Sequence, residues 1–301
     1  MNNYLIIGSN SFSGQSFIKY ISSKKGISKI ICISRSANKK FSPIDIKKHS
    51  IKIKFFRVDL NQSNSINLIS KLIHRYNINL IVNFTSQSMV AESWASPLDW
   101  YQTNVISTIK LVEFLKNQKK IKKFIHFSTP EVYGSQKMFQ KESFSFSPST
   151  PYAISRACSD YHLKLLHKQF KFPVIFTRAS NVYGEYQDFY RLIPKAFLLA
   201  SSKQNFPLHG SGLSKRNFIH IDDVSKALYK IIKKGKTGDS YHISSNNMYS
   251  IKNIVEKIYL ICGLDPKNYI KTRVERLGKD KNYKLDSNKL RRELNWDDKI
   301  T

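Results

Sequence analysis

Four side chains in two short motifs have the types and the spacing of a reaction site. Thr129 and Glu131 follow an apolar run, residues 122–127, that predicts a buried strand. Tyr152 and Arg156 are four residues apart at the start of an amphipathic segment, so a helix places them on one face. We expect the hydroxyl, carboxylate, phenol and guanidinium to meet at the carboxyl edge of a parallel sheet, where open α/β sheets bind ligands.

The N-terminal segment could hold a dinucleotide next to these groups. A short apolar strand, residues 4–7, leads into a turn of small residues from Gly8 to Gly14, and an amphipathic segment follows. Strand, tight turn and helix is the order in which a diphosphate is bound at a helix N-terminus. The central glycine of a G-x-x-G-x-x-G spacing is replaced by Ser11. An ordinary strand–turn–helix unit is the alternative interpretation.

The end of the second predicted strand bears on the choice of cofactor. No acidic residue follows this strand, residues 29–33, where a carboxylate would bind the adenosine ribose. Arg35 and Ser36 stand there instead, which suits a 2′-phosphate, so NADP fits better than NAD, although NAD is possible. The alternative interpretation is that Arg35 is a surface cation with no role in cofactor binding. Asp59 and Leu60 end the third predicted strand, and we expect them to contact the adenine of the cofactor.

Strands and helices alternate along most of the chain. This pattern predicts an α/β fold, a doubly wound parallel Rossmann-type sheet with a smaller, mixed C-terminal substrate domain. We expect a dinucleotide-binding domain over 1–180 plus 217–245. A smaller substrate domain is expected over 181–216 plus 246–301.

Composition narrows the class of protein. The formal net charge is +29, which would suit a nucleic-acid or anionic-membrane partner, but the lysines are spread along the chain and no nucleic-acid-binding signature is present. We therefore expect no nucleic-acid and no membrane partner. The three cysteines have no metal-like spacing, so we expect no metal site, and they favour a reducing, cytoplasmic compartment. We expect no signal peptide and no membrane span.

With these motifs assembled, the chain resembles the extended short-chain dehydrogenase/reductase superfamily. Within it, the resemblance is to nucleotide-sugar 4,6-dehydratases and epimerases, and it covers essentially the whole chain. The ordered motifs that carry the resemblance are residues 8–14, 59–60, 83–90, 128–134, 152–156, 178–184, 216–223 and 276–280.

The resemblance implies a role for each residue of the two central motifs. Tyr152 matches the tyrosine that takes the proton from sugar O4, and Thr129 matches the hydroxyl that binds O4. Arg156 stands where the family usually has lysine, which is not a conservative change. Glu131 matches the base that removes the C5 proton in dehydratases. Pro130 stands where dTDP-glucose 4,6-dehydratases typically have a proton-donating aspartate, and proline has no proton to donate.

The resemblance also assigns binding residues. The expected cofactor-binding residues are Gly8, Ser11, Phe12, Gly14, Arg35, Ser36, Asp59, Leu60, Phe84, Thr85, Ser86, Tyr152 and Arg156. The expected substrate-binding residues are Gln87, Ser88, Asn181, Arg191, Leu192, Pro207, Leu208, Arg216 and Arg276. The implied ligand is a nucleotide-diphosphate sugar, and the implied assembly is a homodimer.

The expected activity is a nucleotide-sugar 4,6-dehydratase of deoxysugar and surface-polysaccharide biosynthesis. A C4 epimerase or reductase needs only Tyr152, Thr129 and Arg156, so it is compatible with Pro130. A UDP-glucuronate decarboxylase would also use the glutamate. A non-catalytic binding protein on a Rossmann scaffold is the alternative of another class.

Overall fold

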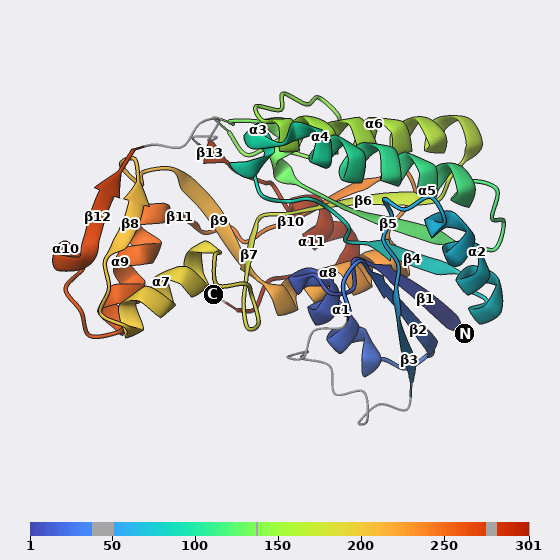
Figure 1. The fold of residues 1–301 in the computed structure, drawn as a ribbon, viewed down its shortest axis with the longest axis horizontal. Coiled ribbons are helices and arrows are strands. Elements are labelled where there is room, and N and C mark those ends of the chain that lie inside the picture. The colour runs from blue at the N-terminus through green and yellow to red at the C-terminus, as the bar shows by residue number, and fades with distance from the viewer. Residues whose placement is uncertain (38–50, 137, 275–281, 301) are drawn as a thin grey trace.

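The chain folds around a seven-stranded, entirely parallel sheet in the computed structural model, which describes residues 1–37, 51–136, 138–274 and 282–300 (Figure 1). From one edge to the other its strands are β10 (Ser240–Ile243), β6 (Val174–Ala179), β5 (Lys123–Ser128), β4 (Leu80–Asn83), β1 (Asn2–Ile7), β2 (Ile27–Ser34) and β3 (Lys52–Arg57). The order reverses between β1 and β4, which opens a crevice at the carboxyl ends of the strands.

Helices cover both faces of this sheet (Figure 1). One apolar cluster joins the sheet to α1 (Phe12–Ser22), α8 (Ile221–Lys234) and α11 (Asn288–Leu294). A second joins the opposite face to α2 (Ser65–Tyr76), α5 (Ser107–Leu115) and α6 (Pro151–Phe170). The central strands are buried on both sides, which explains why several of them are continuous apolar runs such as residues 4–7. The predicted α/β, doubly wound parallel fold is confirmed.

A smaller, mixed lobe lies beside the carboxyl edge of the sheet (Figure 1). Its helices are α7 (Leu192–Ser201), α9 (Ile251–Ile261) and α10 (Pro266–Tyr269). Its strands form two groups, β8 (Phe206–His209) with β12 (Ile270–Arg273), and β9 (Lys215–His220) with β7 (Asn181–Tyr183), β11 (Met248–Ser250) and β13 (Asn282–Tyr283). This lobe has its own apolar cluster, built around α7, α9 and β8. The exact domain boundaries, at 180/181 and 245/246 among others, stay a prediction.

The segment over residues 98–116, whose apolar spacing predicts one helix, is divided. It contains α4 (Pro97–Trp100), a π-helical stretch η2 (Tyr101–Ile106) and α5, after the short helix α3 (Glu92–Ala95). The π-helical turn places the Asn104 side chain against Gln87: its Oδ1 accepts from the Gln87 amide at 2.8 Å, and its Nδ2 donates to the Gln87 oxygen at 3.1 Å. Insertions of this kind are frequent at functional sites.

Within the described ranges, no helix is long and apolar enough to cross a membrane.

Candidate active site

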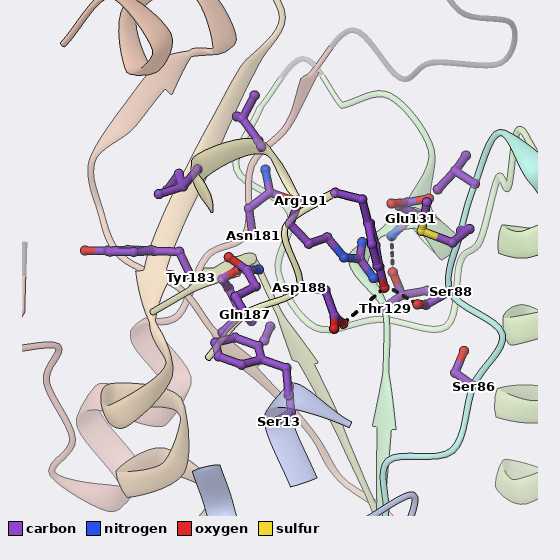
Figure 2. Close-up of a pocket in the computed structure, with 18 of the residues that line it drawn as sticks. Ser13, Ser86, Ser88, Thr129, Glu131, Asn181, Tyr183, Gln187, Asp188 and Arg191 are labelled. Atoms are coloured by element: carbon purple, nitrogen blue, oxygen red, sulfur yellow. Dashed lines mark hydrogen bonds between the residues drawn. The ribbon is translucent and has the colours of Figure 1, made fainter. Parts of the chain in front are cut away.

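A cavity of about 770 Å³ lies where the carboxyl edge of the sheet faces the smaller lobe (Figure 2). It brings together residues that are far apart in the sequence and that the motifs predicted. Those lining it are Ser11, Phe12, Phe84, Ser86, Gln87, Ser88, Thr129, Glu131, Tyr152, Arg156, Asn181, Arg191, Leu192, Pro207, Leu208 and Arg216.

Other predicted residues do not line this cavity. They are Gly8, Gly14, Arg35, Ser36, Asp59, Leu60 and Thr85. Leu60 is only 7 % exposed and packs in the cluster under α2, and Asp59 accepts a hydrogen bond from the Asn61 amide at 3.0 Å. Arg276 lies outside the described residues.

Ser11 caps the helix that begins at the cavity. Its Oγ accepts from the Gly14 amide at 3.1 Å and donates to the Gly8 oxygen at 2.7 Å. Serine is a strong N-cap residue, so its presence in place of a glycine is compatible with the turn. Gly8 has φ of +75°, and a Cβ there would lie 2.9 Å from the Phe84 carbonyl carbon. The turn is therefore tight enough to present a helix N-terminus to a ligand.

This end of the site fits a dinucleotide. The turn and first residues of α1 line the cavity from Asn10 to Ser13, so the positive end of the helix faces the space where a diphosphate would lie. Asn10 Nδ2 donates to Ser36 Oγ at 3.1 Å and to the Ala37 oxygen at 2.6 Å, which connects the turn to the end of β2.

The loop after β5 is fixed from both ends. Thr129 is the N-cap of a 3₁₀ helix, η3 (Pro130–Tyr133), and its Oγ1 accepts from the Glu131 amide at 3.3 Å. Pro130 is the first residue of this helix, where its missing N–H costs nothing. At the other end the Tyr133 hydroxyl lies 2.8 Å from His242 Nε2. The loop therefore holds Thr129 and Glu131 at the cavity, as Figure 2 shows.

The Tyr152 phenol is almost fully buried beside Thr129 and Glu131. Burial raises the pKa of Tyr152, and the Glu131 carboxylate adds to this. The Arg156 and Arg191 guanidiniums and a hydrogen bond with Thr129 lower the pKa. The net effect on the pKa is upward, and the two cations oppose it by favouring ionisation of the phenol.

Arg156 is 1 % exposed and is held by main-chain carbonyls. Its Nη2 donates to the Phe127 oxygen at 2.6 Å, and its Nη1 donates to the Thr85 oxygen at 3.4 Å. Its Nε has no hydrogen-bond partner in the described structure. The guanidinium therefore connects the ends of β4 and β5, and its charge acts on the neighbouring Tyr152.

A buried ion pair lies behind Arg156. Arg178 Nη2 donates to Asp160 Oδ2 at 2.6 Å, and Ser128 Oγ donates to the same oxygen at 2.8 Å. His126 Nε2 lies 3.3 Å from Asp160 Oδ1 and 3.3 Å from Arg156 Nη2. Although burial opposes ionisation, the Arg178 guanidinium and His126 outweigh it and hold the pKa of Asp160 at about 2.

Residues of the smaller lobe complete the cavity wall. Arg191 Nη2 donates to Ser88 Oγ at 3.0 Å, so the loop before α7 contacts the loop after β4 (Figure 2). Arg216 is 7 % exposed, and its Nη1 donates to the Lys215 oxygen at 2.9 Å. Among the described residues, no group of His, Cys, Asp or Glu has an arrangement that could hold a metal ion.

Sequence reasoning missed several polar residues of this wall, among them Gln187, Asp188 and Tyr190. They lie between Asn181 and Arg191, both of which were predicted as substrate-binding. Their position between two predicted contacts is the signal that could have found them.

Comparisons with known proteins agree with this geometry. The family model described as GDP-mannose 4,6 dehydratase matches residues 5–301. The dTDP-glucose 4,6-dehydratase of Haemophilus influenzae is 30% identical over 326 residues, which cover 100% of this chain and 94% of the relative.

Two solved structures are also similar. The dTDP-glucose 4,6-dehydratase DesIV of Streptomyces venezuelae, solved with NAD bound, has a TM-score of 0.90 at 26% identity, covering 99% of this chain and 92% of that one. The dTDP-glucose 4,6-dehydratase of Bacillus anthracis, solved in complex with NAD, has a TM-score of 0.89 at 29% identity, covering 100% and 93%.

The fold and the site thus define a member of the extended short-chain dehydrogenase/reductase type. More narrowly, the chain belongs to the nucleotide-sugar 4,6-dehydratase family. The predicted resemblance is confirmed.

Proposed function

We propose that this protein is a nucleotide-sugar 4,6-dehydratase that uses a nicotinamide dinucleotide. The observation that carries the proposal is a single cavity lined by Tyr152, Thr129 and Glu131, with a dinucleotide-type turn at one end. The relatives named above are dehydratases of dTDP-glucose, which supports the same reaction class here.

The proposed chemistry divides among three side chains. Tyr152 takes the proton from the sugar O4, helped by the positive charge of Arg156, while Thr129 binds the same oxygen. A bound nicotinamide would supply the acceptor for the hydride from C4 and the donor that returns this hydride to C6. Glu131 removes the C5 proton, which a C4 ketone makes acidic, and gives a proton back to C5 at the end.

The proposed nucleotide site is the far half of the cavity. Arg191 and Arg216 supply guanidiniums, which suit a diphosphate, and Asn181 lies near them. Leu192, Pro207 and Leu208 give an apolar wall for the base. Ser88 lies near Glu131 (Figure 2), and Ser88 and its neighbour Gln87 are proposed to contact the sugar.

Two observations concern the choice between NADP and NAD. Arg35 is exposed at the end of β2, compatible with the predicted preference for a 2′-phosphate. The similar solved structures contain NAD, so they do not support that preference.

The test is a panel of dTDP-glucose, UDP-glucose, UDP-GlcNAc and GDP-mannose incubated with protein and either cofactor. We expect one of them to lose a molecule of water and to form a 4-keto-6-deoxy sugar, detected by mass spectrometry and NMR. Cofactor binding without any 4-keto product would refute the proposal for these substrates.

A C4 epimerase or reductase is the second candidate function. Pro130 favours it, because the loop carries no proton donor at that position and epimerisation needs none. An epimerised or reduced sugar with its C6 oxygen retained would identify this activity. Release of carbon dioxide from UDP-glucuronate would indicate a decarboxylase, and ligand binding without turnover would indicate a binding protein.

We also propose a homodimer formed through one exposed apolar face. Large apolar side chains on η2, α4 and α6 are exposed, including Leu98 (78 %), Leu165 (52 %) and Phe170 (61 %). Exposed apolar side chains on helices that contact one another are typical of a protein–protein contact. The cytoplasmic location stays a prediction, as does a role in surface-polysaccharide biosynthesis.

A further inference from the structure

The loop between β7 and α7 places a phenol and a carboxylate in the cavity. Tyr190 and Asp188 both line it, and the Tyr190 hydroxyl donates a hydrogen bond to Asp188 Oδ2 at 3.2 Å. Figure 2 shows the Asp188 carboxylate pointing into the same space as Ser88 and Thr129. Tyr190 is 55 % exposed, and its hydroxyl is held by the Asp188 carboxylate.

Arg191 connects this pair to the reaction centre. Its guanidinium carbon lies 5.2 Å from the centroid of the Tyr190 ring, and its Nη2 donates to Ser88 Oγ. The same guanidinium lowers the pKa of Tyr152. The charge of Arg191 therefore acts on both Tyr190 and Tyr152, and its contact with Ser88 places it where the proposed diphosphate and sugar sites meet.

Dehydration needs a proton that the residues assigned so far do not supply. The C6 hydroxyl leaves as water, so its oxygen must gain a proton while the C6–O bond breaks. Glu131 is then taking the C5 proton, and Tyr152 has taken the O4 proton. Pro130 is buried and has no proton to give.

We propose, on the basis of the dehydratase function above, that Tyr190 protonates the departing C6 hydroxyl and that Asp188 positions it. A sugar hydroxyl placed between the two side chains accepts the phenolic proton and donates its own hydrogen to the carboxylate. Tyr190 is the catalytic residue in this step, and Asp188 is a positioning residue.

The step balances. The C5–H bonding electrons form the C5–C6 double bond, the C5 proton goes to Glu131, and the C6–O electrons leave with oxygen, which gains the Tyr190 proton. The Tyr190 phenolate takes a proton from solvent, to which Tyr152 releases the O4 proton. Each turnover thus forms one water from the O4 proton and the C6 hydroxyl.

The acidity of the phenol suits this role. Burial raises the pKa of Tyr190, and Asp188 adds to this, so the phenol keeps its proton at neutral pH. A phenol, with a pKa of about 10, is still a far stronger acid than water, with a pKa of about 15.7. The Arg191 guanidinium above the ring stabilises the phenolate that forms.

The test compares dTDP-glucose with its 6-deoxy-6-fluoro analogue, because fluoride leaves without needing a strong proton donor. We expect Tyr190→Phe to lower kcat on dTDP-glucose by about 10²–10⁴-fold, the usual contribution of a general acid, and to leave fluoride release unchanged. Asp188→Asn should lower kcat on dTDP-glucose to a smaller extent, again without affecting fluoride release.

Tyr186→Phe is the matched control, because Tyr186 lies on the same loop and does not line the cavity. It should leave both reactions unchanged. Wild-type rates for Tyr190→Phe, or equal losses on both substrates, would overturn the inference while the proposed function stands. If the wild-type protein dehydrates another sugar of the panel instead, the same comparison is made with that sugar and its 6-fluoro analogue. If it dehydrates none of the panel, the proposed function fails and the inference fails with it.

Discussion

Arg156 donates a 2.6 Å hydrogen bond to the main-chain oxygen of Phe127. This contact, together with the one to Thr85, uses the guanidinium to join the ends of two central strands. A lysine would have to make both contacts from one nitrogen, whereas the planar guanidinium makes them from two separate nitrogens in a fixed geometry. Arg156 therefore has a structural function at the sheet edge in addition to its electrostatic effect on Tyr152.

The first prediction concerns the charge of Arg156. Arg156→Met removes a buried cation that lowers the pKa of Tyr152, so the rising limb of the pH–rate profile should move to higher pH. We expect kcat/KM at neutral pH to fall by about 10²-fold or more. Arg156→Lys keeps the charge and should shift the profile less. Identical profiles for Arg156→Met and the wild-type protein would exclude this electrostatic role.

The second prediction separates oxidation from elimination. Glu131→Gln removes the proposed C5 base and leaves Tyr152 and Thr129 in place, so C4 oxidation should persist. Formation of the 4-keto-6-deoxy product should fall by about 10²–10⁴-fold. The measurements are absorbance of the reduced cofactor and deuterium incorporation at C5 from heavy water. Turnover that is insensitive to this change would favour the epimerase or reductase.

The fold could be predicted from the sequence because its signals are local. Buried parallel strands read as short apolar runs, such as residues 4–7 and 80–83, and the helices between them read as amphipathic segments. The π-helical turn in residues 101–106 could not be predicted. It accompanies the contact between Asn104 and Gln87. These two residues are 17 positions apart in the sequence and meet only through tertiary packing.

The site was predictable only where residues belong to recognisable motifs. Tyr152 and Glu131 were found in this way, and the structure places both at one cavity. Asp188 and Tyr190 were missed because the loop that carries them has no periodicity, and their proximity depends on a turn. The role of Ser11 as a helix cap was also missed, since its sequence position suggested only a lost glycine.

The third prediction concerns the buried ion pair of Asp160 and Arg178. Asp160→Asn leaves the Arg178 charge without its partner, so the free energy of unfolding at pH 7 should fall by about 3–5 kcal/mol. Asp222→Asn, at an exposed carboxylate, is the control and should change it by less than about 1 kcal/mol. The measurement is urea unfolding.

The pH dependence of this pair has a defined sign. The pKa of Asp160 is lowered from 3.8 to about 2 on folding, so the stability it contributes is complete above about pH 4 and is lost as the pH falls through about 2. The difference in the free energy of unfolding between wild type and Asp160→Asn should therefore narrow as the pH falls from about 4 to about 2. A difference that stays constant down to pH 2 would contradict the assignment.

The fourth prediction concerns Arg35 and the cofactor. Arg35 is exposed, so a contact with a 2′-phosphate should be worth about 1 kcal/mol, or roughly fivefold in affinity. Arg35→Ala should weaken NADP binding by that factor and leave NAD binding unchanged, as measured by calorimetry. Equal effects on both cofactors would show that Arg35 does not recognise the 2′-phosphate.

The fifth prediction concerns self-association through the exposed face of α4 and α6. Leu98 and Leu165 are both exposed in the single chain, and a charge at either position would have to be desolvated in a dimer. Leu165→Asp should therefore shift the protein towards monomer in sedimentation velocity experiments. Leu260→Asp is the matched control, because Leu260 is 61 % exposed on α9 in the other lobe and should leave the assembly unchanged. If Leu260→Asp dissociates the protein and Leu165→Asp does not, the subunits associate through the smaller lobe instead.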